Sequence, residues 1–252
     1  MKYPDTLLYD ADEILYKASK VSETSVEFDG VECLHSDDEA LWRIIHEAID
    51  HAKARTKCSK VHLAFSDRFG NFRKQVLGSY KEHRKATRKP CGYWDAKDRM
   101  ASHWVSIEYP DLEADDVMGI HHADYACIVS SDKDLKTIPT AIFSPYHDAL
   151  YAITPENADW NFLFQTLTGD SVDGFKGCPR VGKVKAAKIL NSVCPIEGFL
   201  EGSAFPRAWE LVVEAYEGQK LTEDDAIQQA RCARILRPGE WCPIEGVLLW
   251  KP

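Results

Sequence analysis

Three short apolar segments of the chain each run directly into aspartate. Thr6 to Asp12 reads TLLYDAD, Val61 to Asp67 reads VHLAFSD, and Ala126 to Asp134 reads ACIVSSDKD. Apolar runs of this length, separated by helix-like segments, are typical of buried strands in a parallel sheet. Because open α/β folds keep their sites at the carboxyl ends of the strands, we expect these aspartates to meet at one edge of a sheet.

Two further acidic groups lie beside expected helices. LEADD holds Glu113, Asp115 and Asp116 at the start of a helix, and GDSVDG holds Asp170 and Asp173 after another. The helix dipole also favours acids at a helix start, so a simple charge preference is the alternative explanation for LEADD.

Nine carboxylates that converge without a metal would repel one another and raise each other's pKa. Hard divalent cations relieve this repulsion, and ligands that are all oxygen favour Mg²⁺ or Mn²⁺ over zinc. The predicted metal ligands are Asp10, Asp67, Glu113, Asp115, Asp116, Asp132, Asp134, Asp170 and Asp173.

The net charge of −9 is unevenly distributed. Residues 68–89 hold eight basic residues and one acid, so this segment carries +7 and leaves −16 for the remainder. Aromatic residues, among them Tyr80, are interleaved with the cations, a composition that lets bases stack while cations neutralise phosphates. A solvated charged loop is the alternative. We predict nucleic-acid contact, with Arg73, Lys74 and Lys85 among the contacting residues.

A glycine-bearing turn, GCPRVG from Gly177 to Gly182, leads into an expected basic helix. Such a turn offers backbone N–H groups to a phosphate, and Lys183 and Lys185 add affinity that is driven by charge. An ordinary helix–turn–helix hairpin is the alternative. The turn glycines and the two lysines are candidate DNA contacts.

Composition bounds the remaining possibilities. A hydrophobic content of 44% over 252 residues supports one buried core. The chain has neither an apolar run of about 18 residues nor a signal-peptide pattern at its start, so we expect a soluble, cytoplasmic protein without membrane contact. The eight cysteines form no CxxC pair, which favours free thiols over disulfides or a zinc site.

The remaining pattern predicts a hairpin over 21–36, helices over 38–56, 94–103, 206–217 and 222–236, and a strand over 104–109. Strands that alternate with helices indicate an α/β fold.

Paired divalent ions can stabilise both the attacking and the leaving oxygen in phosphodiester displacement. Polymerases and phosphatases use the same chemistry, and no nucleotide-binding P-loop is present. With basic segments to hold a polyanion, the pattern predicts a nuclease.

The order of these motifs resembles the 5′-nuclease superfamily of flap endonucleases and 5′→3′ exonucleases, and within it the small exonucleases of short-tailed coliphages. The likeness covers Thr6 to about Leu190, with more in QQARCARIL and LLWKP. It implies a PIN-like, mostly parallel sheet flanked by helices, in a single domain over 1–252. Residues 1–168 would form the metal-binding core, with a helical arch at about 68–99. Residues 169–252 would form a helix–three-turn–helix element and C-terminal helices.

The resemblance also implies residue roles. Lys81 and Arg84 would steer the scissile phosphate as catalytic cations, and Tyr80 would stack near the reacting end. Asp10, Asp67, Glu113 and Asp115, with Asp116 nearby, would hold a first Mg²⁺. Asp132, Asp134 and Asp173, with Asp170 nearby, would hold a second, and Mn²⁺ could substitute. In the family this turn reads GVPGIG, and its backbone carbonyls can hold a K⁺ ion. The GCPRVG turn of this chain departs from that pattern at its centre, so the K⁺ site does not carry over directly.

The implied activity is divalent-metal-dependent 5′→3′ hydrolysis of duplex DNA with an end, gap or flap, giving 5′-phosphates. The resemblance also implies flap cutting and the removal of RNA primers from RNA–DNA hybrids. It further implies a monomer in the host cytoplasm, with replication or recombination proteins as its partners. One alternative is a DNA-binding or scaffold protein that has lost catalysis, which would predict gaps among the acids. Another is a PIN-type ribonuclease, which would lack the glycine hairpin.

Overall fold

The computed structural model describes residues 2–194 and 196–252, apart from the side chains of Lys85 and Ala86. The chain divides into two compact units. Unit 1 comprises Met1–Arg68, Thr87–Asp132 and Ala141–Tyr151, and unit 2 comprises Phe69–Ala86, Lys133–Thr140 and Ala152–Pro252. The predicted division at residue 168 differs from this grouping, because two short segments of the first half pack with the C-terminal helices. Each unit is described by itself.

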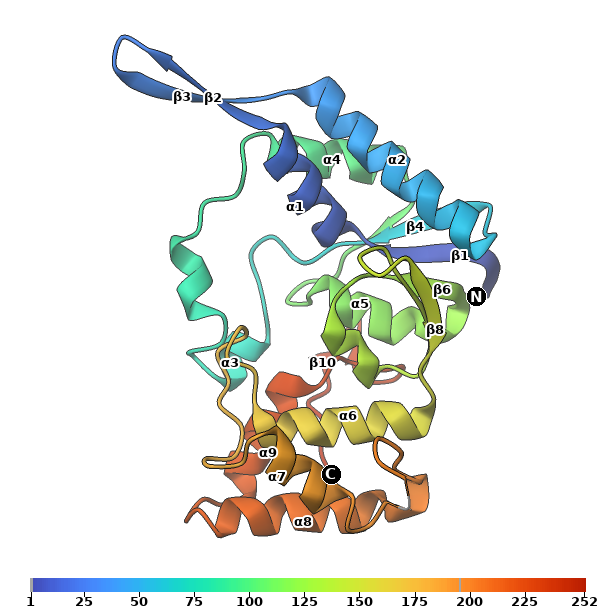
Figure 1. The fold of residues 1–252 in the computed structure, drawn as a ribbon, viewed down its shortest axis with the longest axis vertical. Helices are drawn as coiled ribbons and strands as arrows, with labels where there is room; N and C mark the ends of the chain where they lie inside the picture. Colours follow the sequence, from blue (N-terminus) through green and yellow to red (C-terminus); the bar gives the residue numbers. More distant parts are fainter. Residues whose placement is uncertain (1, 195) are drawn as a thin grey trace. The chain divides into compact units, whose positions relative to one another are not determined.

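Unit 1 is built on a sheet of six strands in the order β5-β4-β1-β6-β7-β8 (Figure 1). The pairs β1–β4, β1–β6, β4–β5 and β6–β7 are parallel, as the sequence predicts. The strands are β1 (Tyr3–Asp10), β4 (Lys60–Ala64), β5 (Ser106–Ile107), β6 (Tyr125–Val129), β7 (Ala141–Ser144) and β8 (Ala149–Ala152). The predicted strands at 61–67 and 104–109 are shorter than expected, and β8 was not predicted.

Helices cover both faces of this sheet. On one face Leu7 and Tyr9 of β1 pack with the apolar sides of three helices, and Leu15, Ile45 and Met100 are fully buried there. On the other face α5 packs against β1 and β4. The helices are α1 (Ala11–Ser22), α2 (Asp38–Thr56), α4 (Tyr93–His103) and α5 (Ala114–His121), with the 3₁₀ turn η2 (His122–Asp124).

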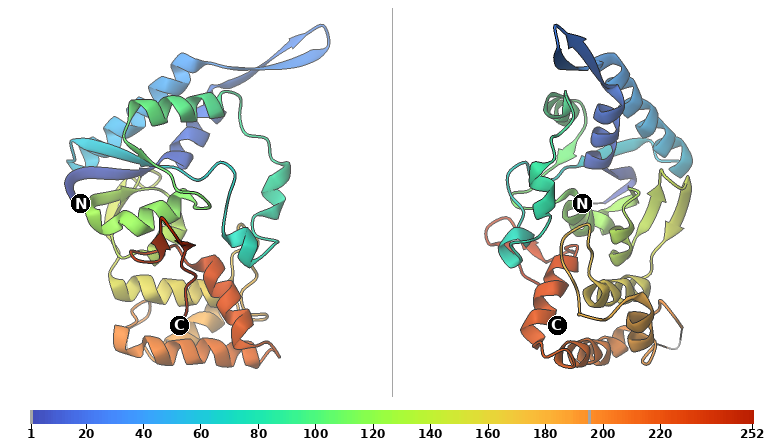
Figure 2. Two further views of the ribbon diagram at one scale, coloured as in Figure 1. Left: turned by 180° about the vertical axis from the view of Figure 1, so that it is seen from behind. Right: turned by 60° about the vertical axis from the view of Figure 1, so that its left-hand side comes forward.

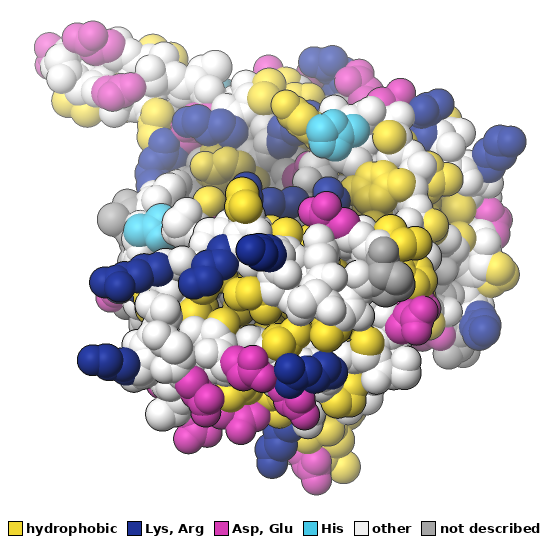
Figure 3. Space-filling view, turned by 60° about the horizontal axis from the view of Figure 1, so that its bottom comes forward, with side chains coloured by type: hydrophobic (Ala, Val, Ile, Leu, Met, Phe, Trp, Pro, Cys, Tyr) yellow, Lys and Arg dark blue, Asp and Glu magenta, His cyan; other side chains and the backbone are white. Residues whose placement is uncertain are grey.

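A two-stranded antiparallel hairpin, β2 (Glu23–Phe28) and β3 (Val31–Ser36), joins α1 to α2. It turns at Asp29-Gly30, where both residues have positive φ, which confirms the predicted hairpin. The further views show it extending away from the sheet of unit 1 (Figure 2). Phe28 and Val31 face each other and are 77% and 60% exposed, and acidic and apolar side chains cover its surface (Figure 3).

Unit 2 is helical. Its core joins Phe162, Phe175, Leu190, Val212 and Tyr216, which come from four segments of the chain. The elements are α3 (Arg73–Val76), η1 (Glu82–Ala86), η3 (Lys133–Thr137), α6 (Pro155–Thr168), α7 (Lys183–Leu190), η4 (Gly202–Ala204), α8 (Phe205–Glu217), α9 (Glu223–Ala233), and the short pair β9 (Trp241–Cys242) and β10 (Gly246–Val247).

Helix starts follow the local sequence. Thr154 caps α6 by accepting from the Asn157 N–H, and Pro155 stands in the first turn, where its fixed φ suits a helix start. Thr222 and Asp225 form a capping box at the start of α9. The eight cysteines are all free thiols, which confirms that prediction. Over the described residues, no helix is long and apolar enough to cross a bilayer.

Two glycines of unit 2 allow the backbone to pack on itself. Gly169 and Gly177 have φ of 66° and 64°, and a Cβ built at Gly177 would lie 2.3 Å from the Gly169 nitrogen. The Cys178 N–H donates to the Leu167 carbonyl across this contact, at 2.9 Å. Any larger residue at position 177 therefore forces two backbone segments apart.

We expect Gly177→Ala to lower the free energy of unfolding by roughly 2 kcal/mol, because it adds both a positive-φ penalty and a backbone clash. Gly182→Ala is the matched control, since φ there is −84° and a Cβ would meet nothing within 4 Å. Urea denaturation measures both variants. Equal losses would mean that the close approach at Gly177 is not what stabilises this turn.

Candidate active site

Three adjacent strands bring aspartates to one edge of the sheet in unit 1. Asp10 ends β1, which lies between β4 and β6 and is parallel to both. In register, Asp10 pairs with Ala64 and Tyr9 with Val129, so the chain continues from these partners to Asp67 and Asp132. The sheet thus places the three predicted aspartates at the same carboxyl edge.

Asp10 is buried, with only 6% of its surface exposed. It caps α1 by accepting from the Glu13 N–H at 3.2 Å, and it accepts from the Ser130 hydroxyl at 2.9 Å. Ser130 Oγ also accepts from the Asp132 N–H at 3.1 Å, so one hydroxyl links two predicted ligands. Burial, reinforced by the negative charges of Asp12 and Glu13, raises the pKa of Asp10 to about 8.

Asp12 and Glu13 were not among the predicted site residues, although the sequence DADE contains them. Asp12 accepts from the Ser66 N–H at 3.2 Å, and Glu13 accepts from the Ser131 N–H at 2.7 Å. Burial raises the pKa of Asp12, and hydrogen bonding to Ser66 with nearby lysine charge offsets only part of the rise. The available signal was the i, i+2, i+3 spacing of acids where a buried strand passes into a helix.

Hydrogen bonds from backbone N–H groups connect the segment that holds Asp67 to LEADD. Asp67 accepts from the Asp111 N–H at 2.8 Å, and the Ala114 N–H donates to Ser66 Oγ at 2.9 Å. Asp116 is fully buried and accepts from the Glu113 N–H at 3.2 Å, at the start of α5. Glu113 and Asp116 form a capping box at the start of α5, so the helix-start explanation of LEADD holds for both, while Glu113 and Asp115 are partly exposed.

Lys97 is a buried cation beside these acids. Its Nζ donates to the Ser66 carbonyl at 2.8 Å and pairs with Glu108 at 2.8 Å. It also lies 5.2 Å from the Phe65 ring. No local pattern marks this lysine, because it lies in a helix with an ordinary amphipathic pattern.

The donor chemistry of unit 1 fits a hard divalent cation, since Asp10 is buried next to two more carboxylates. Among the described side chains, however, no group of three or more His, Cys, Asp or Glu is placed to hold one ion. Asp10, Asp12, Asp67 and Glu13 each accept a backbone N–H group.

In unit 2 the predicted acidic ligands are balanced by cations. Lys133 pairs with Asp170 at 2.5 Å and with Asp134 at 3.8 Å, and Gln165 donates to Asp134 at 2.8 Å. Burial on its own raises the pKa of Asp170, but hydrogen bonds from Lys133 and the Val172 N–H outweigh it and leave the pKa below its usual value.

Asp173 is surrounded by residues of the basic segment. It accepts from the Tyr80 hydroxyl at 3.0 Å and from Arg84 at 3.1 Å, and Lys81 lies 3.5 Å away. The Lys81 N–H donates to the Asp173 carbonyl at 2.8 Å. A Cβ at Gly174 would lie 2.7 Å from the Ser79 carbonyl oxygen, so this glycine permits the close approach. The two predicted catalytic cations are thus held by a predicted metal ligand.

Two residues that were predicted to contact DNA are buried in unit 2 instead. Tyr80 is 2% exposed and belongs to the core of unit 2, so its ring is not presented for stacking. Arg73 is also 2% exposed, and it donates to the Cys232 and Arg234 carbonyls, so it stabilises the fold of unit 2. Lys74 is exposed, and the side chain of Lys85 lies outside the described part.

The glycine turn leads into α7 as expected. Gly182 is the N-cap, and Lys183 and Lys185 are exposed on the first turns of the helix. The Gly177 N–H donates to Gln229 at 2.9 Å, so this predicted phosphate donor is engaged within the protein.

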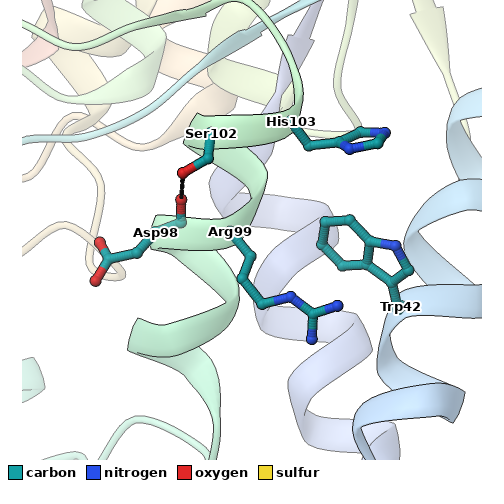
Figure 4. A pocket seen from close by; sticks show the side chains of 5 residues that line it. All are labelled: Trp42, Asp98, Arg99, Ser102 and His103. Carbon is teal, nitrogen blue, oxygen red and sulfur yellow. Dashed lines mark hydrogen bonds between the residues drawn. The ribbon is translucent and has the colours of Figure 1, made fainter.

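A separate open pocket of unit 1, of about 430 Å³, lies between α2 and α4 (Figure 4). The Arg99 guanidinium lies 4.5 Å from the Trp42 ring, and His103 borders the same space. Asp98 is the one carboxylate of its lining, so the pocket does not match the predicted metal site.

Comparison with known proteins agrees with this geometry. No family model matches the chain. The exodeoxyribonuclease of Enterobacteria phage T3 is 32% identical, over 98% of this chain and 92% of that protein. The exonuclease of Escherichia phage T7 is 31% identical, over 98% of this chain and 93% of its own. The chain belongs to this family of phage exonucleases.

Solved structures of the bacteriophage T5 5′-exonuclease share the fold. One with bound zinc superposes with a TM-score of 0.59 at 14% identity, over 90% of this chain and 93% of that one. The T5 flap endonuclease complex with DNA and metal ions gives 0.56 at 15% identity, over 90% and 98%. The resemblance to phage exonucleases and the α/β fold class, both predicted from sequence, are confirmed.

The raised pKa of Asp10 predicts a pH-dependent stability in EDTA. The native state keeps a proton that the unfolded chain releases, so stability falls as pH rises from about 4 to about 8, by at most about 1.4 kcal/mol per pH unit. Asp10→Asn should lose less stability over this range. Urea unfolding at pH 5 and pH 8 measures the difference, with Asp50→Asn on exposed α2 as the control. Parallel pH profiles for wild type and Asp10→Asn would contradict it.

Proposed function

We propose that this protein is a divalent-metal-dependent 5′→3′ exonuclease that hydrolyses phosphodiesters of duplex DNA and leaves 5′-phosphates. The observation that carries the proposal is that Asp10, Asp67 and Asp132 end or follow three adjacent parallel strands at one edge of the sheet. Its support is membership of the phage exonuclease family over nearly the whole chain.

Metal binding is proposed for the carboxyl edge of unit 1. Asp10, Asp67 and Asp132, with Glu113 and Asp115, would hold Mg²⁺, and Asp12 and Glu13 add negative charge at the same edge. When bound, a divalent ion would stabilise the negative charge that develops on phosphate oxygens during hydrolysis. The T5 structures with divalent ions support this choice for the fold. Asp134, Asp170 and Asp173 stay predicted ligands in unit 2.

The chain's own groups would orient the reaction. Asp10 sits in a low-dielectric site, where its charge interacts more strongly than in water. The Ser130 hydroxyl fixes the direction of Asp10 and of the Asp132 backbone. Lys81 and Arg84 carry positive charge for a phosphate, and pairing with Asp173 preorganises both side chains.

DNA is the proposed substrate. Exposed Lys74, Lys183 and Lys185 in unit 2 would contact phosphates without reading sequence. We extend the proposal to flapped and gapped DNA, since the T5 relative of the same fold is described as a flap endonuclease. RNA-primer removal and a K⁺ ion at the GCPRVG turn stay predictions.

Asp132→Ala should abolish cleavage of 5′-labelled duplex, gapped and flapped DNA in Mg²⁺ while leaving DNA binding largely intact. Asp132 is exposed, so its removal should not disturb the core, and Asp50→Ala is the matched exposed control. Mg²⁺ should raise the melting temperature of the wild type more than that of Asp132→Ala, because a ligand stabilises only the state that binds it.

Wild-type protein that binds DNA but does not cut it in Mg²⁺ or Mn²⁺ would favour the non-catalytic alternative. Cleavage of RNA in preference to DNA would favour the ribonuclease. The first product sizes separate stepwise removal of nucleotides from cutting at a flap.

Lys81→Ala should lower single-turnover cleavage by about a hundredfold and change DNA affinity by much less, because its charge acts on the reacting phosphate. Lys136→Ala, at an exposed lysine of the same unit, is the charge-matched control. A quench-flow assay with saturating enzyme measures the rate. An unchanged rate in Lys81→Ala would remove that residue from the active site.

A further inference from the structure

Asp67 lies outside the sheet that positions Asp10. Asp10 is the last residue of β1, and it pairs in register with Ala64, the last residue of β4. Asp67 comes three residues after Ala64. The register of the sheet therefore sets the place of Asp10, whereas the place of Asp67 depends on what holds the segment after β4.

Backbone hydrogen bonds attach this segment to β5 and to the loop before α5. The Phe65 N–H donates to the Ile107 carbonyl at 3.0 Å, and the Asp67 N–H donates to the Leu112 carbonyl at 2.8 Å. Asp111, whose N–H donates to the Asp67 carboxylate, has a φ of 62°. A residue other than glycine keeps this backbone conformation only where its surroundings fix it. The segment and the loop therefore hold each other in one arrangement.

Ser66 is hydrogen-bonded to three helices. Its N–H donates to Asp12 of α1 at 3.2 Å, its hydroxyl oxygen accepts from the Ala114 N–H of α5 at 2.9 Å, and its carbonyl accepts from Lys97 of α4 at 2.8 Å. The first N–H groups of a helix have no partner within that helix, and the Ser66 hydroxyl supplies one for α5. Three helices and the end of β4 are thus joined at one residue, directly before Asp67.

Lys97 supports this junction from inside the fold. It is 7% exposed, and its ammonium also pairs with Glu108 at 2.8 Å. A hydrogen bond from a charged donor is stronger than one from a neutral donor, above all where water is excluded. Loss of the ammonium would therefore remove a strong restraint on the backbone next to Asp67.

The strand on the other side of β1 leads into a serine with a similar arrangement. Ser130 follows the end of β6, and its hydroxyl donates to Asp10 at 2.9 Å and accepts from the Asp132 N–H at 3.1 Å. Strand β1 lies between β4 and β6. Both neighbours of this central strand therefore continue into a serine whose hydroxyl links two segments that carry carboxylates.

We propose that Ser66 is a positioning residue of the carboxyl edge of unit 1. Its hydroxyl holds the start of α5, and with it Glu113 and Asp115, in a fixed place relative to Asp67, and Lys97 supports Ser66 through the carbonyl. The inference rests on the proposed nuclease function, because the acids that Ser66 positions are the proposed ligands of the divalent ion. Ser66 acts through these ligands rather than on the ion or the DNA.

Titration calorimetry with Mn²⁺, in the absence of DNA, tests the role of the hydroxyl. Ser66→Ala should bind Mn²⁺ about tenfold more weakly than the wild type, which is the lower end of the range for hydrogen bonds that orient metal ligands. Ser66→Thr keeps a hydroxyl and should restore most of the affinity. Ser102→Ala is the matched control, because the Ser102 hydroxyl donates to the Asp98 carbonyl within α4. Wild-type affinity in Ser66→Ala would overturn the proposal.

Cleavage gives a second signature of positioning. With saturating DNA, Ser66→Ala should need about tenfold more Mn²⁺ to reach half of its maximal rate, and a high Mn²⁺ concentration should recover most of the rate. Its affinity for DNA in EDTA should equal that of the wild type. Weaker DNA binding in EDTA, with an unchanged dependence of the rate on Mn²⁺, would place Ser66 in the DNA-binding surface and would contradict the proposal.

The sign of the Lys97 effect separates positioning from charge. Loss of a positive charge near carboxylates would by itself tighten the binding of a cation, whereas loss of support for Ser66 would weaken it. We expect Lys97→Met to bind Mn²⁺ several-fold more weakly. Met100→Ala, at a fully buried residue of the same helix, should lower the melting temperature but keep the Mn²⁺ affinity. Tighter binding in Lys97→Met would remove Lys97 from the positioning role.

A measurement without metal checks the hydrogen bond itself. In EDTA, the Ala114 amide should exchange its hydrogen with solvent several-fold faster in Ser66→Ala than in the wild type, because its acceptor is gone. Ser102→Ala should leave that exchange rate unchanged. Equal exchange rates in Ser66→Ala and the wild type would mean that the Ser66 hydroxyl does not hold the start of α5.

The outcomes separate this inference from the proposed function. If the wild type binds Mn²⁺ but cuts no DNA, the proposed function fails, and the Mn²⁺ affinities still decide the role of Ser66. If the wild type cuts DNA while Ser66→Ala keeps the wild-type affinity for Mn²⁺, the inference fails and the nuclease stands. Equal losses of affinity in Ser66→Ala and Ser102→Ala would also overturn the inference, and a wild type that binds no Mn²⁺ would overturn both.

Discussion

Negative charge is concentrated where a buried strand ends. Asp10 lies almost entirely out of solvent, and Asp12 and Glu13 follow within the next three residues. Burial and these two negative charges together favour the neutral form of Asp10. Hydrogen bonds from Ser130 and the Glu13 backbone recover only part of the lost hydration. Stable folding without a metal is therefore compatible with a proton on this carboxylate, and a divalent ion would take the place of that proton.

In unit 2 the carboxylates are paired with cations. Asp170 is paired with Lys133, and Asp173 with Lys81 and Arg84, so local cations already balance their charge. Such pairs fix the directions of the cations. The same residue type thus has two roles in this chain, since Asp10, Asp12 and Glu13 gather negative charge where a buried strand ends, while Asp173 fixes the directions of Lys81 and Arg84.

The basic segment also has two kinds of cation. Arg73 is buried and supports the backbone of α9 and the residues after it, whereas Lys89 is exposed and its ammonium lies near the rings of Tyr93 and Tyr16. Counting charges along 68–89 could not separate these cases. The distinction depends on which carbonyls, rings and carboxylates surround each side chain, and these partners come from distant parts of the sequence.

The sequence alone determined the buried strands that lead into aspartate, their parallel direction, the hairpin at Asp29-Gly30, the caps at Thr154 and Thr222, and the family. These features depend on local patterns, and residues a few positions apart carry them. Tertiary structure decided that Asp12 and Glu13 join the Asp10 group, that Tyr80 and Arg73 are buried, and that Arg88 meets Glu23. Burial and partner choice depend on packing between segments that lie tens of residues apart, which no local pattern encodes.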